Sequence, residues 1–454
     1  MARIEKENAL QEDIGQLENN DLVEELPTPE EEYTRENRHR KKTAAWGLGL
    51  LIAIETVIAG IYGQKIWSED LYSRVLREQE IRSSGQIKLT QGMYTGETDF
   101  GYFSGQGQFA FETGENYTGN WDHNQLKGKG TLNIPSEGTY EGDFLASQKN
   151  GKGKFEWSDG VVYEGEWKND QMCGQGTYTT PNGVVYSGTF DNNDFQDGTC
   201  KFDNSTGNYI LTYKDGLIDK AEIEYTDGST YVGTCSINGL TGTGTMVFVS
   251  GDTYVGSFSA GYRKGQGVYS WISGDKYDGE WAADQMNGSG TYTYSDGSYV
   301  SGTFEKNLFI NGSYHIENNF GNYTFTITNG EATAVEMTLA NGTTYSGAMR
   351  NGVLSGQAQI QYSNGDRYSG TVSTGQKSGN GTYTWTSGAS YEGSWSADQM
   401  NGNGTYYYPQ NENGYKLAGS FENGKPNGEC QYYITSSTHY KTDWSKGKCV
   451  KIYE

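Results

Sequence analysis

The sequence has little of the material from which an ordinary globular core is built. Only 34% of its 454 residues are hydrophobic, even with tyrosine and cysteine counted among them. A two-layer core of leucine, isoleucine and valine is therefore hard to build. With only 6 prolines and 14% aromatic residues, the composition also argues against a collagen-like rod and against a wholly disordered chain.

Cysteine and histidine are also sparse. The 5 cysteines show no Cys-x-x-Cys spacing, so the sequence predicts neither a zinc site nor a dense disulfide framework. The 4 histidines lie far apart, and no Ser/His/Asp or metal-ligand grouping is visible. We therefore expect a protein that is not an enzyme and that needs no metal and no cofactor.

Basic residues are outnumbered by acidic ones. The 34 lysines and arginines face 57 aspartates and glutamates, which gives a net charge of −23. Such a field repels nucleic-acid phosphates and anionic lipid headgroups. Nucleic acid is therefore excluded as the expected partner, and phospholipid binding is the least favoured binding function.

Long apolar runs are absent except for one. Residues 44–63 hold twenty positions with a single charge, which is the length that a helix needs to cross a bilayer. We predict one transmembrane helix within residues 43–66. A disordered tail, first acidic and then basic, would precede it over residues 1–42, and a helical juxtamembrane stalk would follow over residues 67–85. A buried helix of a soluble protein is the alternative.

The flanks of this run predict its orientation. Five basic residues lie between positions 35 and 42, so the positive-inside rule places the N-terminus in the cytoplasm of a single-pass cell-membrane protein and residues 86–454 outside the cell. Gly49 and Ala53 form part of a row of small residues that would let two such helices pair, and Glu55 could face the partner helix. Self-association is therefore expected at the membrane.

Glycine and aromatic residues are abundant instead, and they repeat. The chain has 65 glycines, 36 tyrosines, 16 phenylalanines and 10 tryptophans. Tyr117, Tyr140 and Tyr163 are 23 residues apart, each followed by a glycine two residues later and by Trp or Phe two residues after that. Most of these units then carry a Gly-x-Gly pair and a turn such as Asp159-Gly160. Repeats of this length indicate an array of small structural units.

A longer period lies on top of the short one. Tyr163, Tyr277 and Tyr391 are 114 residues apart, and the sequence Asp-Gln-Met returns at the same interval. We therefore divide residues 86–454 into three super-repeats of 114 residues. The fifth unit of each is degenerate, as at residues 209–216 and 323–330, and we expect a bend or an altered face there.

The period of two residues along a strand explains the choice of residues. Tyr163, Gly165 and Trp167 would project from one face, and Gly174, Gly176 and Tyr178 would share a face of the partner strand. In an antiparallel hairpin, the rings could then lie across glycines that have no side chain. The glycines expected to have this structural role are Gly165, Gly174, Gly176, Gly279, Gly288, Gly290, Gly393, Gly402 and Gly404.

The pattern Tyr-x-Gly-x-Trp/Phe, six residues and Gly-x-Gly at a 23-residue step resembles the MORN repeat family over most of residues 94–454. This resemblance implies consecutive hairpins that add to one long sheet, open at both ends. The expected fold is therefore all-β, an open single-layer antiparallel β-hairpin solenoid preceded by one transmembrane α-helix.

The row of rings is the candidate binding surface, and its alternative role is internal packing. We expect a membrane-anchored, non-catalytic scaffold whose repeats contact a protein partner or a second copy of the chain. Binding of a cell-surface carbohydrate to the rings is the alternative, and phospholipid binding is less favoured. The candidate binding residues are Tyr117, Trp121, Tyr140, Tyr163, Trp167, Tyr254, Tyr277, Trp281, Tyr368, Tyr391 and Trp395.

Overall fold

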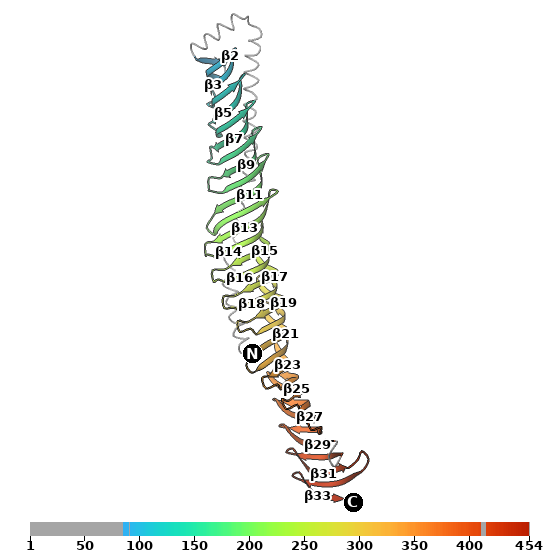
Figure 1. Cartoon of the computed structure of the whole chain (residues 1–454). Coiled ribbons are helices and arrows are strands. Elements are labelled where there is room, and N and C mark those ends of the chain that lie inside the picture. Colours follow the sequence, from blue (N-terminus) through green and yellow to red (C-terminus); the bar gives the residue numbers. More distant parts are fainter. Residues whose placement is uncertain (1–84, 90, 410–414, 454) are drawn as a thin grey trace. The chain divides into compact units, whose positions relative to one another are not determined.

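The computed structural model describes residues 85–89, 91–409 and 415–453. These residues form 33 β-strands with no helix among them, which confirms the all-β prediction for this part of the chain. Figure 1 labels many of these strands. They divide into two compact units. Residues 85–249 with 258–261 form the N-terminal unit, and residues 250–257 with 262–453 form the C-terminal unit.

The N-terminal unit contains strands β1 to β15. Their bounds are β1 (Gln86–Leu89), β2 (Gly92–Asp99), β3 (Tyr102–Phe111), β4 (Asn116–Asp122), β5 (Gln125–Ile134), β6 (Gly138–Leu145), β7 (Gln148–Trp157), β8 (Val162–Lys168), β9 (Gln171–Thr179), β10 (Val185–Asp191), β11 (Asp194–Asp203), β12 (Gly207–Lys214), β13 (Leu217–Tyr225), β14 (Thr230–Ser236) and β15 (Gly239–Val247). The boundary between the two units falls within β16 (Thr253–Ser259).

The C-terminal unit contains strands β17 to β33. Their bounds are β17 (Tyr262–Ser270), β18 (Lys276–Ala282), β19 (Gln285–Thr293), β20 (Tyr299–Glu305), β21 (Leu308–Asn318), β22 (Gly321–Thr328), β23 (Glu331–Leu339), β24 (Thr344–Arg350), β25 (Val353–Gln361), β26 (Arg367–Ser373), β27 (Gln376–Thr384), β28 (Ser390–Ser396), β29 (Gln399–Tyr407), β30 (Lys416–Glu422), β31 (Lys425–Tyr433), β32 (His439–Ser445) and β33 (Lys448–Tyr453).

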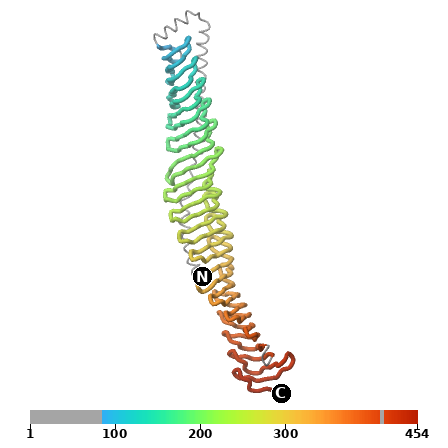
Figure 2. The backbone as a smooth tube through the Cα atoms, viewed as in Figure 1, coloured from blue at the N-terminus to red at the C-terminus, as the bar shows by residue number. Residues whose placement is uncertain are grey.

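Within each unit the strands pair antiparallel with their neighbours in the chain, as the to-and-fro path of the backbone in Figure 2 shows. In the hairpin β8–β9, Tyr163 lies opposite Tyr178, and Gly165 lies opposite Gly176. The next pairing, β9–β10, sets Gly176 opposite Gly188. Each unit is thus an open antiparallel sheet of successive hairpins, as the solenoid prediction requires.

The tyrosine rings lie over glycines, as the pattern predicts. A Cβ atom built on Gly165 would come 2.5 Å from the hydroxyl oxygen of Tyr163, and one on Gly176 would come 2.3 Å from it. Both distances are too short for a real contact, so only glycine fits under the ring. Since Gly165 and Gly176 belong to the two strands of one hairpin, each tyrosine closes over its own hairpin.

Gly174 and Gly176 lie opposite Phe190 and Gly188 in the regular register of β9–β10, as expected for two residues of one face, but Gly174 lies in a bulge of the β8–β9 pairing. The register of β8–β9 shifts after Gly165, and the resulting bulge leaves Gly174 at a φ of +55°. A Cβ atom on Gly174 would meet the carboxylate of Glu166 at 2.4 Å, on the face opposite the rings. The equivalent Gly288 and Gly402 also have positive φ and would meet Glu280 and Ser394. These three glycines permit a left-handed bulge and do not form part of the seat for a ring.

Two kinds of turn connect the strands. The predicted turn at Asp159-Gly160 is present, with a φ of +90° at Gly160. At the other end of the hairpin, Asn169 and Asp170 form a two-residue turn with φ of +50° and +64°. Met172 follows this turn and lies in strand β9.

The degenerate fifth units do not interrupt the sheet. Strands β11, β12 and β13 pair in order, with Leu211 opposite Ala221 at the positions where regular units have two glycines. The ring of Tyr209 cannot lie over these larger side chains and instead stacks on Phe202 at 4.7 Å between centroids. The face is altered there, as expected, while the strand pairing continues.

The N-terminal predictions lie outside the described residues. These are the tail (1–42), the transmembrane helix (43–66) with Gly49, Ala53 and Glu55, and the stalk (67–85) apart from its last residue, and they stay predictions. Within residues 85–89, 91–409 and 415–453, no helix combines the length and the hydropathy that crossing a bilayer requires.

Candidate interaction surface

The predicted row of rings is buried. The exposed fractions run from 0% at Tyr163 to 6% at Trp395, and all eleven side chains contribute to the core of their unit. Their proposed role in binding stays a prediction, and the contacts below show what these rings do within the sheet.

The rings form a ladder that links neighbouring hairpins. Tyr163 meets Trp167 of its own strand edge-on at 5.2 Å between centroids, and it meets Phe190 of the next hairpin edge-on at 5.1 Å. Trp167 in turn meets Tyr140 of the preceding hairpin at 5.4 Å. Its indole nitrogen donates a hydrogen bond to the carbonyl oxygen of Gly153, at 3.1 Å. Edge-to-face contacts of this kind stabilise a core beyond the burial of area alone.

The tyrosine hydroxyls are also satisfied within the ladder. Tyr163 donates to the carbonyl oxygens of Glu166 at 3.1 Å and Cys173 at 3.2 Å. Burial raises the pKa of Tyr254, Tyr368 and Tyr391 to about 12. The removal of these phenols from water disfavours the phenolate, so the rings stay neutral at physiological pH.

A hydrogen bond from the side chain of a turn residue fixes several of the hairpins to the one before it. Asn193 is the second residue of the β10–β11 turn, and its side-chain oxygen accepts a hydrogen bond from the backbone N–H of Met172 at 2.8 Å. The backbone N–H of Asn193 donates back to the carbonyl of Met172 at 3.1 Å. We call this reciprocal pair, which spans 21 residues, the turn clamp. It recurs with Asn124, Ser147, Asp170, Asp284, Asn307 and Asp398 as acceptors.

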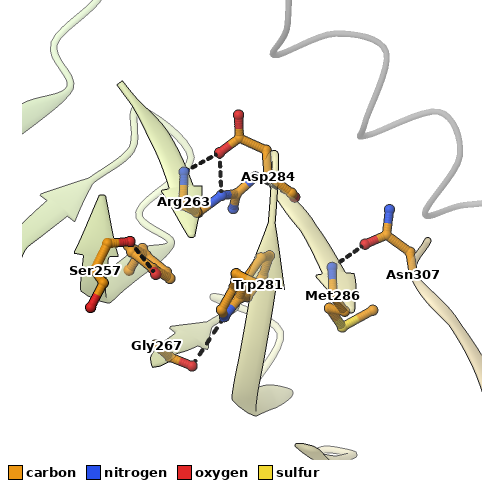
Figure 3. A network of polar contacts seen from close by, with 8 residues as sticks. Ser257, Arg263, Gly267, Trp281, Asp284, Met286 and Asn307 are labelled. Atoms are coloured by element: carbon orange, nitrogen blue, oxygen red, sulfur yellow. Dashed lines mark hydrogen bonds and ion pairs between the residues drawn. The ribbon is translucent and has the colours of Figure 1, made fainter. Parts of the chain in front are cut away.

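In the C-terminal unit, one turn clamp contains a cation enclosed by rings (Figure 3). The backbone N–H and the Nε atom of Arg263 both donate to Oδ1 of Asp284, at 2.8 and 3.0 Å. The guanidinium carbon lies 4.7 Å from the ring centroid of Trp281 and 5.1 Å from that of Tyr269. The Arg263 side chain is only 11% exposed. A cation over aromatic faces and beside a carboxylate is strongly held.

The same cluster occurs 114 residues before and after. Lys149 Nζ lies 4.9 Å from the ring centroid of Trp167, and the backbone N–H of Lys149 donates to Oδ1 of Asp170 at 2.9 Å. Burial lowers the pKa of Lys149, while the charge of Asp170 acts in the opposite direction. Lys377 Nζ lies 5.4 Å from the ring centroid of Trp395 and 3.2 Å from Oδ1 of Asp398.

Sequence reasoning missed these clusters, although the signal was there. Arg or Lys stands at positions 149, 263 and 377, which have the same 114-residue spacing as the tyrosines. In each cluster a cation of the chain already lies over the aromatic rings, so the clusters brace the sheet.

Nine stretches of the chain match the family profile described as MORN repeat, namely residues 117–139, 140–162, 163–185, 254–276, 277–299, 345–367, 368–390, 391–412 and 418–438. The chain carries MORN repeats. The unmatched stretches between them, 186–253 and 300–344, contain the degenerate units in which Leu211 and Val300 replace residues of the motif. MORN repeats are typically non-catalytic scaffold elements that contact proteins or membrane lipids.

Solved structures show weaker likenesses. A point mutant of the TCP10 domain of Danio rerio CPAP is 13% identical with a TM-score of 0.26, over 51% of this chain and 98% of that chain. The SAS-4 (dCPAP) TCP domain of Drosophila melanogaster, in complex with a proline-rich motif of Ana2 (dSTIL), is 15% identical with a TM-score of 0.17, over 44% and 90%. A streptogramin B lyase structure is 11% identical with a TM-score of 0.11, over 67% and 93%.

These likenesses carry no argument about function, because all three identities are under 25% and all three TM-scores are under 0.5. No curated protein matches the chain.

The MORN units hold a second row of rings that sequence reasoning did not single out. In several units, aromatic residues stand two and four positions after the second glycine of Gly-x-Gly, as at Tyr383 and Trp385 after Gly381. In the C-terminal unit, part of this row is partly exposed. We call it the aromatic strip and define it as Tyr362, Tyr383, Trp385, Tyr406, Tyr408 and Tyr432.

The described part of the chain contains no group of three or more His, Cys, Asp or Glu side chains that could hold a metal ion. All five cysteines are free thiols, and burial raises the pKa of Cys200 to about 12, which makes its nucleophilic thiolate scarce. The aromatic strip is a partly exposed part of the C-terminal unit.

Proposed function

We propose that this protein is a membrane-anchored MORN-repeat scaffold whose repeats contact a protein partner or a second copy of the chain. One observation carries the proposal. In the regular hairpins, the aromatic, turn and basic side chains contact the neighbouring hairpin through the ring ladder, the turn clamps and the enclosed cations. An array built this way presents an extended, regular face, which is the feature by which repeat proteins bind other proteins.

Cross-linking of the full-length protein in its native membrane tests the scaffold function. We expect residues of the repeats to cross-link to one defined protein or to a second copy, and we expect unlabelled repeat protein to compete. The matched control is the same chain with residues 277–390 removed, which keeps the anchor and loses one period. Cross-links confined to single molecules, or unchanged by that deletion, would contradict the scaffold.

The membrane anchor is a separate part of the proposal. It is supported by the twenty nearly uncharged positions of residues 44–63 and by the basic residues before them, which favour an external location for the repeats. Protease added to intact cells should then remove the repeats. Protection of the repeats in intact cells, together with cleavage after lysis, would reverse the orientation and make the scaffold intracellular.

Two other binding functions have less support. Carbohydrate binding through the predicted row would need Tyr163, Trp167 and their equivalents at the surface, whereas these rings are at most 6% exposed. Phospholipid binding would bring a chain with a net charge of −23 against anionic headgroups. Protein contact is therefore the function that we propose.

A further inference from the structure

The aromatic strip is a continuous surface feature of the C-terminal unit. Its ring centroids follow one another at 5.6 Å from Tyr362 to Tyr383 and 4.7 Å from Tyr383 to Trp385. They continue at 5.5 Å to Tyr406, 5.0 Å to Tyr408 and 6.1 Å to Tyr432. All six side chains are partly exposed. The strip therefore crosses successive hairpins at the ends of strands β25, β27, β29 and β31.

Two of the equivalent rings one period earlier are buried. Tyr269 corresponds to Tyr383 and is 2% exposed, and Tyr292 corresponds to Tyr406 and is 7% exposed. Trp271 corresponds to Trp385 and is partly exposed like it, and it lies between those two buried rings, at 4.5 and 5.2 Å between centroids. The tyrosines of the motif are thus buried in one period and partly exposed in the next. The burial of Tyr269 and Tyr292 shows that the motif can pack without exposing these two rings.

Hydrogen bonds to neighbouring side chains fix two rings of the strip, Tyr362 and Tyr383. The hydroxyl of Tyr383 donates to Oδ2 of Asp366 at 2.8 Å. Lys377 Nζ donates to the hydroxyl of Tyr362 at 3.4 Å and forms an ion pair with Asp398. Lys377, Asp366 and Asp398 already have partners within the unit, so these charges do not favour an ionic ligand. The strip suits a neutral ligand with apolar groups.

The tilt of the rings argues for a corrugated surface. The interplanar angles along the strip are 37°, 53°, 53°, 74° and 81°, so the rings do not form one flat platform. Flat stacking of a polymer along the strip would need nearly coplanar rings. Tilted rings leave depressions between them that receive compact apolar groups such as proline rings, as in aromatic-lined sites for proline-rich segments.

The spacing of the strip selects the ligand conformation. One ring of the strip returns per hairpin at Tyr362, Trp385 and Tyr408, each 23 residues apart. Two strands at about 4.8 Å give a step of about 9.6 Å. A polyproline II helix advances about 9.3 Å per three-residue turn. Two turns of an α-helix advance about 10.5 Å per heptad, a threefold larger mismatch.

We propose that the aromatic strip binds a proline-rich segment in the polyproline II conformation, with one turn of the segment on each hairpin from β25 to β31. This inference rests on the proposed scaffold function and names the chemistry of the partner. A polyproline II segment is already extended before it binds, so it loses little conformational entropy on the rigid sheet.

The test uses the full-length protein and a fluorescein-labelled peptide of ten prolines as the probe, with fluorescence anisotropy as the readout. We expect saturable binding below about 1 mM. Trp385→Ala should weaken that binding about tenfold, as expected for a central aromatic anchor. Trp385→Tyr, which keeps a ring, should retain most of the affinity.

Trp271→Ala is the matched control, since it removes the same residue type from the same unit position in the same structural unit. It should leave binding of the probe unchanged, because the two rings that flank Trp271 are buried. Both alanine variants should lower the thermal unfolding temperature by a similar amount, since each loses a packed indole ring. A second pair of probes tests the spacing. Repeats of Pro-Pro-Leu, with leucine at every third residue, should bind more tightly than repeats of Pro-Pro-Pro-Leu.

Several outcomes would overturn this proposal. These are no saturable binding of the proline peptide, equal loss of binding in Trp271→Ala and Trp385→Ala, or equal binding of the two leucine-containing probes. Trp385-dependent binding of an amphipathic helical peptide or of a glucan oligosaccharide, without binding of the proline peptide, would assign the strip to another ligand class. The scaffold function fails separately, in the cross-linking experiment, whatever the proline peptide does.

Discussion

At the scale of single residues, the contact between a tyrosine ring and two glycines decides which side chains the strands can carry. In Gly176→Ala, the new methyl group would overlap the ring of Tyr163, whose nearest atoms would lie 2.3 and 2.5 Å away. We expect the free energy of unfolding to fall by about 2 kcal/mol, from overpacking without backbone strain. Urea unfolding followed by circular dichroism measures this change.

A double-mutant cycle separates overlap from a general loss of stability. Tyr163→Ala removes the ring that the new methyl group would meet, so Gly176→Ala should cost much less in the Tyr163→Ala background than in the parent. Additive costs of the two substitutions would show that the ring and the glycine do not interact.

The buried phenols predict the response of the protein to alkali. The pKa of Tyr254, Tyr368 and Tyr391 is raised to about 12 in the folded state, from an ordinary value near 10. Between these pH values the unfolded chain has lost protons that the folded chain still binds. The free energy of unfolding should therefore be at its full value below pH 10 and fall steadily towards pH 12.

Absorbance at 295 nm and urea unfolding at each pH check this prediction together. We expect phenolate absorbance from these tyrosines to appear only with the loss of the β-sheet signal. Reversible ionisation of all 36 tyrosines near pH 10 in a folded protein would contradict it. Tyr254→Phe, which cannot ionise, should make the fall in stability less steep.

At the scale of the hairpin, the turn clamp is the element that joins one hairpin to the preceding one. Asn193→Gly keeps a residue that tolerates the φ of +72° at this position but removes the acceptor for the backbone N–H of Met172. We expect a loss of about 1–2 kcal/mol, because a buried donor is left without its partner. Asn193→Ala should cost about 1 kcal/mol more, from its left-handed backbone.

Asn192 provides the control within the same turn, since it has a φ of +50° but an exposed side chain. Asn192→Gly should therefore change stability by only a few tenths of a kcal/mol. Equal costs for Asn192→Gly and Asn193→Gly, measured by urea unfolding, would show that the turn clamp does not stabilise the sheet.

Much of the hairpin could be predicted from the sequence, because Tyr163, Gly165 and Trp167 follow the two-residue period of a strand. The positive φ of Gly174 could not be predicted from that period, because the bulge in β8–β9 interrupts it. The partners of the turn clamp stand 21 residues apart on different hairpins, so only the packed sheet shows that Asp170 reaches Lys149. The partial exposure of Tyr383 likewise depends on its neighbours in space, since Tyr269 has the same local motif and is buried.

At the scale of the whole chain, the 114-residue period predicts that one period can be removed. Deletion of residues 277–390 joins two equivalent points of the repeat and lies within the C-terminal unit. In a repeat array, stability is approximately a sum over units and their neighbours. We expect the shortened protein to keep its β-sheet circular dichroism per residue and to unfold within a few degrees of the parent.

A deletion out of phase is the control for that experiment. Removal of residues 277–379 ends in the middle of β27. The positions of the tyrosine and tryptophan rings would then lie opposite the positions of the bulge glycines in the paired strand. We expect this variant to aggregate or to lose cooperative unfolding. If both deletions behave alike, the 114-residue period has no structural meaning.

Each hairpin is held only by the hairpins next to it, and this also determines how each unit would respond to mechanical force. The strands run across the unit. Tension applied to its two ends would therefore break the hydrogen bonds between an edge strand and its neighbour one after another. The bonds of a whole strand pair would never resist together. Such a sheet would extend hairpin by hairpin at low force and re-form when the load is released, which suits a spacer under fluctuating strain better than a rigid strut.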